Sequence, residues 1–131
     1  MDFVLNESYN IYLQIIRKYI AMNTQLEYLY HNAGNYKWFG EVVISGALKR
    51  VDIEPYLYEH QFFIPSEVGL PDLQPEKLTE EDHIWHEIVS LKETKAEPTV
   101  EISAGIFVEG FKATHAVEWN WLKVMERKGF C

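Results

Sequence analysis

The segment HIWHE holds the residues whose types and spacing come closest to suggesting chemistry. His83 and His86 are three positions apart, and Glu87 follows directly. On a helix such a pair points to one side, as half of a metal site requires. Helical zinc motifs, however, place their histidines four positions apart with a glutamate between them. We therefore predict no metal site and interpret the pair as solvated or partner-facing.

Motifs for other chemistry are missing from the sequence. It has no G-x-S-x-G turn, no phosphate-binding glycine loop and no dinucleotide fingerprint, and its single cysteine, Cys131, is the last residue. His31, His60 and His115 complete the set of histidines, and His60 or His115 could act as a general base beside a glutamate in a cavity. The sequence does not decide whether the chain is an enzyme, but it favours a non-catalytic role without a cofactor.

The negative charge is concentrated in the middle of the chain. The net charge is −8 over 131 residues, and residues 51–101 alone hold three basic and thirteen acidic side chains, a balance of −10. Phosphates approaching such a segment meet repulsion instead of releasing counterions, so nucleic acid and anionic membranes are poor partners. A basic protein would be attracted to it.

Aromatic residues are interleaved with these acids, as in many protein interfaces, where aromatic anchors lie inside a polar rim. Most of these aromatics are more simply interpreted as core residues, and the acids as a solvated face that keeps the domain soluble. We predict partner contacts by eight residues of this region: Glu54, Tyr58, Glu59, Glu80, Glu81, Asp82, Trp85 and His86.

Three functions fit this composition. The first is a small acidic binding protein that inhibits a basic protein partner, in the manner of an immunity protein or antitoxin. The second is a small enzyme or ligand-binding domain with a cavity between helix and sheet. The third is a nucleic-acid mimic that blocks a DNA-binding protein. Specific partner and oligomeric state are outside what the sequence specifies.

The compartment follows from weaker signals. A terminal cysteine cannot form an intrachain disulfide, and the start MDFVLNESYN lacks the basic and then apolar residues of a secretory signal. No run approaches the 18 or so apolar residues of a membrane helix. We expect a cytoplasmic protein with no membrane partner, and a single domain over residues 1–131.

Helical periodicity is clearest over residues 5–30. Leu5, Tyr9, Tyr12, Ile16, Tyr19, Ile20, Leu26 and Tyr30 recur every three to four residues. The pattern predicts a long N-terminal helix that ends near Gly34. Alternation then predicts strands over residues 35–50, 56–64 and 99–110, and an irregular connection over residues 65–75.

Two segments are ambiguous. Residues 79–95 begin with a capping threonine and three acids, which predicts a helix, although a short turn followed by a strand from Glu87 also fits. Residues 112–128 end in basic residues, a glycine and a phenylalanine, which is typical of a helix C-terminus. The expected fold is α+β, with the long N-terminal helix packed on an antiparallel sheet of three or more strands and one or two further helices. If both ambiguous segments are strands, the element order would resemble a cystatin-like or NTF2-like fold, a helix wrapped by four or five strands.

Overall fold

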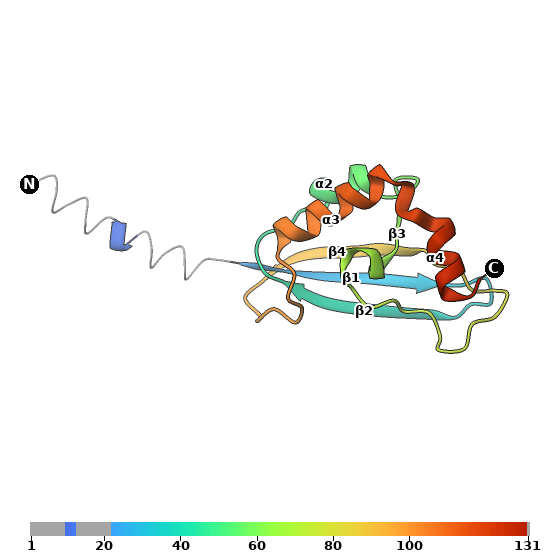
Figure 1. The fold of residues 1–131 in the computed structure, drawn as a ribbon. Helices are drawn as coiled ribbons and strands as arrows, with labels where there is room; N and C mark the ends of the chain where they lie inside the picture. The colour runs from blue at the N-terminus through green and yellow to red at the C-terminus, as the bar shows by residue number, and fades with distance from the viewer. Residues whose placement is uncertain (1–9, 13–21, 131) are drawn as a thin grey trace, which may run out of the picture.

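The computed structural model describes residues 10–12 and 22–130, and its centre is a four-stranded antiparallel sheet (Figure 1). The strands are β1 (Asn23–His31), β2 (Lys37–Ile44), β3 (Phe62–Phe63) and β4 (His86–Thr94), in the order β2-β1-β4-β3. The main helices are α2 (Arg50–Ile53), α3 (Ala104–Ala116) and α4 (Trp121–Lys128). Short 3-10 turns form η1 (Glu54–Tyr56), η2 (Pro65–Val68) and η3 (Glu118–Asn120).

The helices lie on one side of the sheet. Figure 1 shows α2 and α3 above the strands and α4 beside the right-hand ends of the strands. We call the helix-covered side the inner face and the opposite side the outer face. The inner face and the helices share one apolar core, in which Leu26, Phe63, Phe107, Phe111 and Trp119 are almost fully buried. Among the residues that the structure describes, no helix is long and apolar enough to cross a membrane.

The predicted N-terminal helix is wrong over its last third. Asn23–His31 is the central strand β1, whose inner-face residues Thr24, Leu26, Tyr28 and Tyr30 are buried at every second position. Positions four apart share a face in both a helix and a strand, so Leu26 and Tyr30 fitted either pattern. Backbone pairing with β2 on one side and β4 on the other makes this segment a strand. Residues 10–12 are helical, and residues 5–9 and 13–21 lie outside the described part.

The first predicted strand is confirmed as β2, but its partner differs. It forms a hairpin with β1, from Thr24 opposite Ile44 to His31 opposite Lys37. The segment predicted as its partner, residues 56–64, contributes only Phe62–Phe63 to the sheet. Pro55 lies in the 3-10 turn η1 just before it, because a proline cannot donate a ladder hydrogen bond.

Residues 79–95 are not a helix. They form a turn at residues 79–82 and then strand β4, which is the alternative that the sequence left open. The threonine and acids that suggested a helix cap make the turn: the backbone N–H of Thr79 donates to the Asp82 carboxylate at 2.8 Å. Asx-type bonds of this kind compete with helix formation, because they satisfy the backbone locally.

The prediction of a strand over residues 99–110 is also wrong, because helix α3 begins at Ala104. The Ser103 hydroxyl accepts from the backbone N–H of Ile106 and caps this helix. Its buried residues Ala104, Phe107, Phe111 and Thr114 have helical spacing, which the alternation of the preceding residues concealed.

The C-terminal helix is confirmed, in two pieces. Helix α3 continues to Ala116 and α4 runs to Lys128, with Gly129 at φ 86° and the Phe130 N–H donating to the Met125 carbonyl at 2.9 Å. Between them, Glu118, Trp119 and Asn120 all have positive φ, at 51°, 63° and 47°. This left-handed link turns the chain and buries the Trp119 indole, whose N–H donates to the Tyr56 carbonyl at 3.1 Å.

The α+β class therefore holds in its broad sense, but the arrangement differs from the expectation. The two longest described helices, α3 and α4, follow the strands, and β1 lies inside the sheet, where a long helix was expected to cover it. The same finding excludes the cystatin-like or NTF2-like alternative, which also needs a leading helix wrapped by the strands.

Candidate functional site: the outer face of the sheet

A row of side chains crosses the whole outer face. Phe39 of β2 is paired with Leu29 of β1, Leu29 with Glu87 of β4, and Glu87 with Phe62 of β3. Residues directly opposite one another in antiparallel strands point to the same face. Phe39 is 51% exposed and Leu29 and Phe62 are half-buried, so the described chain leaves an apolar band open.

A hollow of 230 Å³ lies in this row, between β1 and β3. We call it the outer-face hollow, and its lining residues are Leu29, His31, Phe62, His83, Trp85 and Glu87. They come from β1, β3, β4 and the segment before β4, so the hollow exists only when the sheet is assembled. Its wall combines apolar side chains, imidazoles, an indole and one carboxylate.

The Trp85 indole is held from one side. Tyr58 stacks on it with ring centroids 4.3 Å apart and planes 12° apart, and Phe62 lies at 6.4 Å. Tyr58 is positioned by a tight turn: Gln61 N–H donates to the Tyr58 carbonyl at 3.1 Å, and the central residues Glu59 and His60 have φ of 52° and 59°. Two positive φ values are the signature of a type I′ hairpin turn.

His83 has a fixed orientation. Its Nδ1 accepts from the Trp85 N–H at 3.0 Å, and its Nε2 lies 2.7 Å from the His31 carbonyl oxygen. A neutral ring with its proton on Nε2 satisfies both bonds. The two ring nitrogens are thus used within the protein, and His83 presents ring surface to the hollow.

A buried carboxylate anchors this corner from beneath. Asp82 Oδ1 accepts from the Tyr30 hydroxyl at 2.6 Å and the Asn32 amide at 3.0 Å, while Oδ2 accepts from Thr79 N–H. Burial alone would raise the pKa of Asp82, but the hydrogen bonds from Tyr30, Asn32 and Thr79 outweigh it and lower that pKa. Burial and the bond to Asp82 raise the pKa of Tyr30. Every partner is satisfied, so this network is structural.

His86 belongs to the core instead of the surface. It is 0% exposed, its Nε2 accepts from the Leu73 N–H at 2.9 Å, and its Nδ1 lies 3.1 Å from the Ile84 carbonyl oxygen. Burial among aromatic rings lowers its pKa from 6.5 to about 4. A neutral imidazole therefore bridges two loops across the core.

Two glutamates face each other beside the apolar band. Glu27 of β1 is directly opposite Glu41 of β2, one outward position away from the Leu29–Phe39 pair. Neither carboxylate forms an ion pair with a side chain that the structure describes. Like charges in direct opposition destabilise a sheet, so this part of the outer face is unfavourable for the isolated chain.

The eight residues predicted to contact a partner separate into three groups. Trp85 lines the outer-face hollow, Tyr58 stacks on it, and Glu59 is exposed in the turn that follows Tyr58. Glu54, Glu80 and Glu81 are exposed elsewhere, the first in η1 and the others on the turn at residues 79–82. Asp82 and His86 are buried and engaged within the protein, so no partner reaches them in this structure.

Sequence reasoning did not find Leu29 and Phe62 as neighbours of Trp85, nor Phe39 as the partner of Leu29. They come from strands that pair over long distances in the chain, and no local pattern reports such pairing. The outward alternation of Leu29, Glu27 and Gln25 was the available signal, but the helical interpretation of this segment concealed it.

The other histidines do not form a catalytic or metal site in the described chain. His60 is exposed in its turn, and His115 is exposed and packs edge-on against Tyr56 at 5.8 Å. His83 and His86, three positions apart, lie on opposite sides of the turn into β4 and are not paired. Over residues 10–12 and 22–130, no group of three or more histidine, cysteine or acidic side chains is placed to hold a metal ion.

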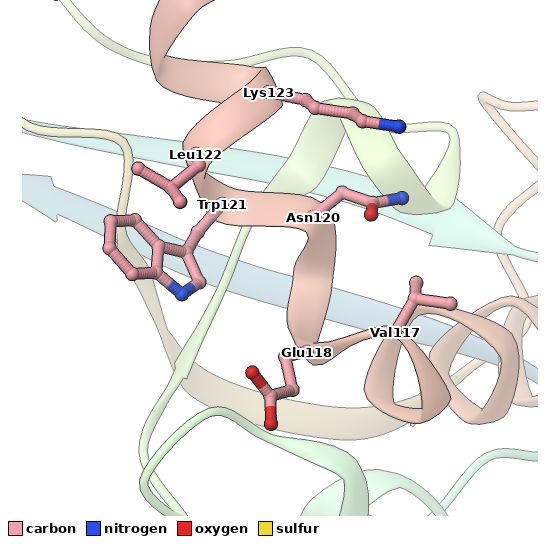
Figure 2. A pocket seen from close by; sticks show the side chains of 6 residues that line it. All are labelled: Val117, Glu118, Asn120, Trp121, Leu122 and Lys123. Atoms are coloured by element: carbon pink, nitrogen blue, oxygen red, sulfur yellow. The ribbon is translucent and has the colours of Figure 1, made fainter.

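A second hollow, of 240 Å³, lies at the left-handed link between α3 and α4. Figure 2 shows Trp121 and Leu122 on one side of the bend and Asn120 and Lys123 on the other. All of its lining residues come from residues 117–123, so it is the concave side of one bend and not a meeting of separate elements. It is the weaker candidate for that reason.

Comparison of the chain with known protein families, with curated proteins and with solved structures finds no significant match. The geometry of the outer face is therefore the basis for the functional argument.

Proposed function

We propose that this protein is a stoichiometric binding protein that captures and inhibits a basic protein partner, as an immunity protein or antitoxin does. The observation that carries the proposal is the assembled outer face, where an apolar band and a stacked Tyr58–Trp85 pair stand open among carboxylates. Aromatic anchors within a polar rim are the usual composition of a binding surface.

Charge supports the same proposal. Glu27 and Glu41 oppose one another on the outer face, Glu87 lines the hollow, and Glu59 is exposed in the adjoining turn. Opposed carboxylates that destabilise the free chain would become favourable against a cationic partner. Folding and binding thus favour different charges at these positions, which is typical of a surface retained for recognition.

The two alternative functions gain no comparable support. An enzyme with His60 or His115 as its base would need the histidine beside a carboxylate in a cavity, whereas both histidines are exposed and His115 packs against the Tyr56 ring. A nucleic-acid mimic would need carboxylates spaced along one edge with few apolar groups. Here an apolar band runs through the acidic surface.

The test begins with affinity capture. The tagged full-length protein is incubated at low salt with extract of its source, and bound proteins are identified by intact mass and then produced in pure form. We expect a basic protein whose own activity is lost at a one-to-one ratio. Failure to recover any protein partner under these conditions would contradict the proposal.

Two variants of equal charge then locate the surface. The first replaces Glu27 and Glu41 of the outer face and Glu59 of the adjoining turn by glutamine. The second replaces Glu93, Glu97 and Glu101, which are exposed towards the opposite end of β4 and beyond it, in the same way. Rim charges act mainly through steering, so only the first variant should slow association and flatten its dependence on ionic strength. Equal effects of the two variants would show that net charge alone matters and that the partner does not dock here.

A further inference from the structure

We infer that the outer-face hollow receives the side chain of an arginine from the partner. This inference rests on the proposed function, because it specifies the chemistry by which the partner is recognised. It names one occupant for one place, and it can fail while the proposed function stands.

The size of the hollow suits a single side chain. Pockets for drug-sized ligands run from about 300 to 1,000 Å³, and this one has 230 Å³. Leu29 and Phe62 supply apolar wall for an aliphatic stem, and they are adjacent across Glu87 in the register of the sheet. An arginine places its apolar stem along such a wall while its charged head reaches polar groups.

The Trp85 indole provides a stacking surface. Tyr58 stacks on one of its faces at 4.3 Å, and the half-buried indole also lines the hollow, where an arriving group would meet it. Indole is the best aromatic partner for a cation. A guanidinium is planar and weakly hydrated, so it stacks on an aromatic face more readily than a compact ammonium does.

Glu87 provides the counter-charge inside the hollow. Its Oε1 already accepts from the Gln61 amide at 2.6 Å, which orients the carboxylate and leaves Oε2 without a described partner. The backbone of Glu87 is fixed by pairing on both sides, with Leu29 and Phe62. A charge-assisted bond from guanidinium to a preoriented carboxylate is strong and directional.

The remaining lining residues are compatible with a cation. Both ring nitrogens of His83 are used within the protein, so it presents a ring and not a competing donor. Lys37, which pairs with His31 at the hairpin end, is the described basic residue placed nearest along the outer face. Its positive charge would repel a cationic side chain that approaches the hollow from that side. The acids Glu59, Glu27 and Glu41 would attract a cationic side chain from the other sides.

The test uses three peptides and the full-length protein. Acetyl-Gly-Arg-Gly-amide, its lysine counterpart and its citrulline counterpart are titrated separately into labelled protein, and the Trp85 indole and the amides of Leu29 and Glu87 are followed by NMR. Citrulline has the shape of arginine without its charge. We expect the arginine peptide to bind at least fivefold more tightly than the lysine peptide, and the citrulline peptide to cause no saturable shift.

Variants distinguish the hollow from general acidity. Glu87→Gln should weaken the arginine peptide at least fivefold, and Trp85→Leu should remove saturable binding, whereas the matched control Glu93→Gln should change nothing. The inference is overturned if arginine and lysine bind equally, if Glu87→Gln has no effect, or if the shifts occur away from the hollow or do not occur at millimolar peptide.

Its failure is separable from that of the proposed function. If a partner is captured and inhibited but binds Glu87→Gln as tightly as the original chain, the arginine inference fails alone. If the arginine peptide binds as expected but no protein partner exists, the inference holds for the hollow and the proposed function fails.

Discussion

The two faces of the sheet are made by neighbouring residues of the same strands, yet their chemistry differs completely. Phe62 lies on the outer face and Phe63 in the core, and His86 is fully buried while Glu87 lines the outer-face hollow. On the inner side every buried polar side chain of the described residues has a hydrogen-bond partner. On the outer side, Glu27 and Glu41 oppose one another without an ion pair.

This difference separates what folds the chain from what remains available for binding. The inner face is satisfied internally, so changes there should cost stability. The outer face contains groups that the described chain does not satisfy, so changes there should cost recognition and little stability. Four predictions test this separation, in order of decreasing effect.

Replacing adjacent phenylalanines gives the largest contrast. Phe63 is 0% exposed and its ring contacts Tyr28 and Phe111 at centroid distances of 5.8 Å, so Phe63→Ala should destabilise by about 3–5 kcal/mol. Phe62→Ala, on the half-buried outer side, should cost much less. Urea unfolding of both variants measures the difference. Similar midpoints for the two would mean that the faces are not distinct in energy.

Acid should destabilise the inner face through His86. The unfolded chain protonates this imidazole below its ordinary pKa of 6.5, whereas the buried ring has a pKa of about 4. Its contribution is therefore complete above pH 6.5 and is lost progressively as the pH falls towards 4, by about 3 kcal/mol. Unfolding free energies across this range, together with the ring C–H signals of His86, provide the measurement. A His86 signal that titrates near pH 6.5 in the folded protein would contradict the prediction.

The buried carboxylate should be sensitive to loss of its charge alone. Asp82→Asn keeps the size of the side chain but presents a donor or a weaker acceptor to Thr79 and Tyr30. We expect a cost of about 1–3 kcal/mol. Glu80→Gln, the same change two residues earlier on an exposed side chain, is the control and should cost little. Thermal unfolding of the two variants measures these losses of stability. Equal losses would rule out a structural role for the hydrogen bonds around Asp82.

The smallest effect should have the opposite sign. Glu41→Lys converts the opposed pair with Glu27 into an attractive one, so we expect it to stabilise the chain by about 0.2–1 kcal/mol at low salt. Glu97→Lys makes the same charge change on an exposed residue after β4. If both variants gain equally, relief of the overall negative charge explains the result and the opposed pair contributes nothing.

Some of the fold could be predicted because the deciding signals are local. Strand β2 and the C-terminus of α4 were predicted, the second from Gly129 and Phe130, whose geometry closes the helix within a few residues. Strand β1 and the start of α3 were not. In β1 the helical and strand periods coincide at Leu26 and Tyr30, and in α3 the capping Ser103 interrupts an alternation that otherwise continues.

The candidate site was predicted in part for the same reason. Tyr58 and Trp85 were chosen for their types, and the structure stacks their rings on one another beside the hollow. Leu29 and Phe39 required the β2-β1-β4-β3 order, which arises from pairings distant in the chain. Burial of His86 depended on Leu73, which lies in the connection before β4 and donates to it.

The free edge of β2 is protected over only part of its length. The backbone N–H of Val43 donates to the Thr99 hydroxyl at 2.8 Å, and the N–H of Thr99 donates to the Val43 carbonyl at 2.9 Å. The segment after β4 therefore occupies that portion of the edge. Backbone groups alternate along a strand, which means that Glu41, Phe39 and Lys37 direct theirs outwards as Val43 does. Exposed edges invite other chains to add a strand and aggregate. Here charged residues flank the exposed phenylalanine on both sides, and charges placed in this way are the common means by which proteins resist such self-association while keeping an apolar group at the surface.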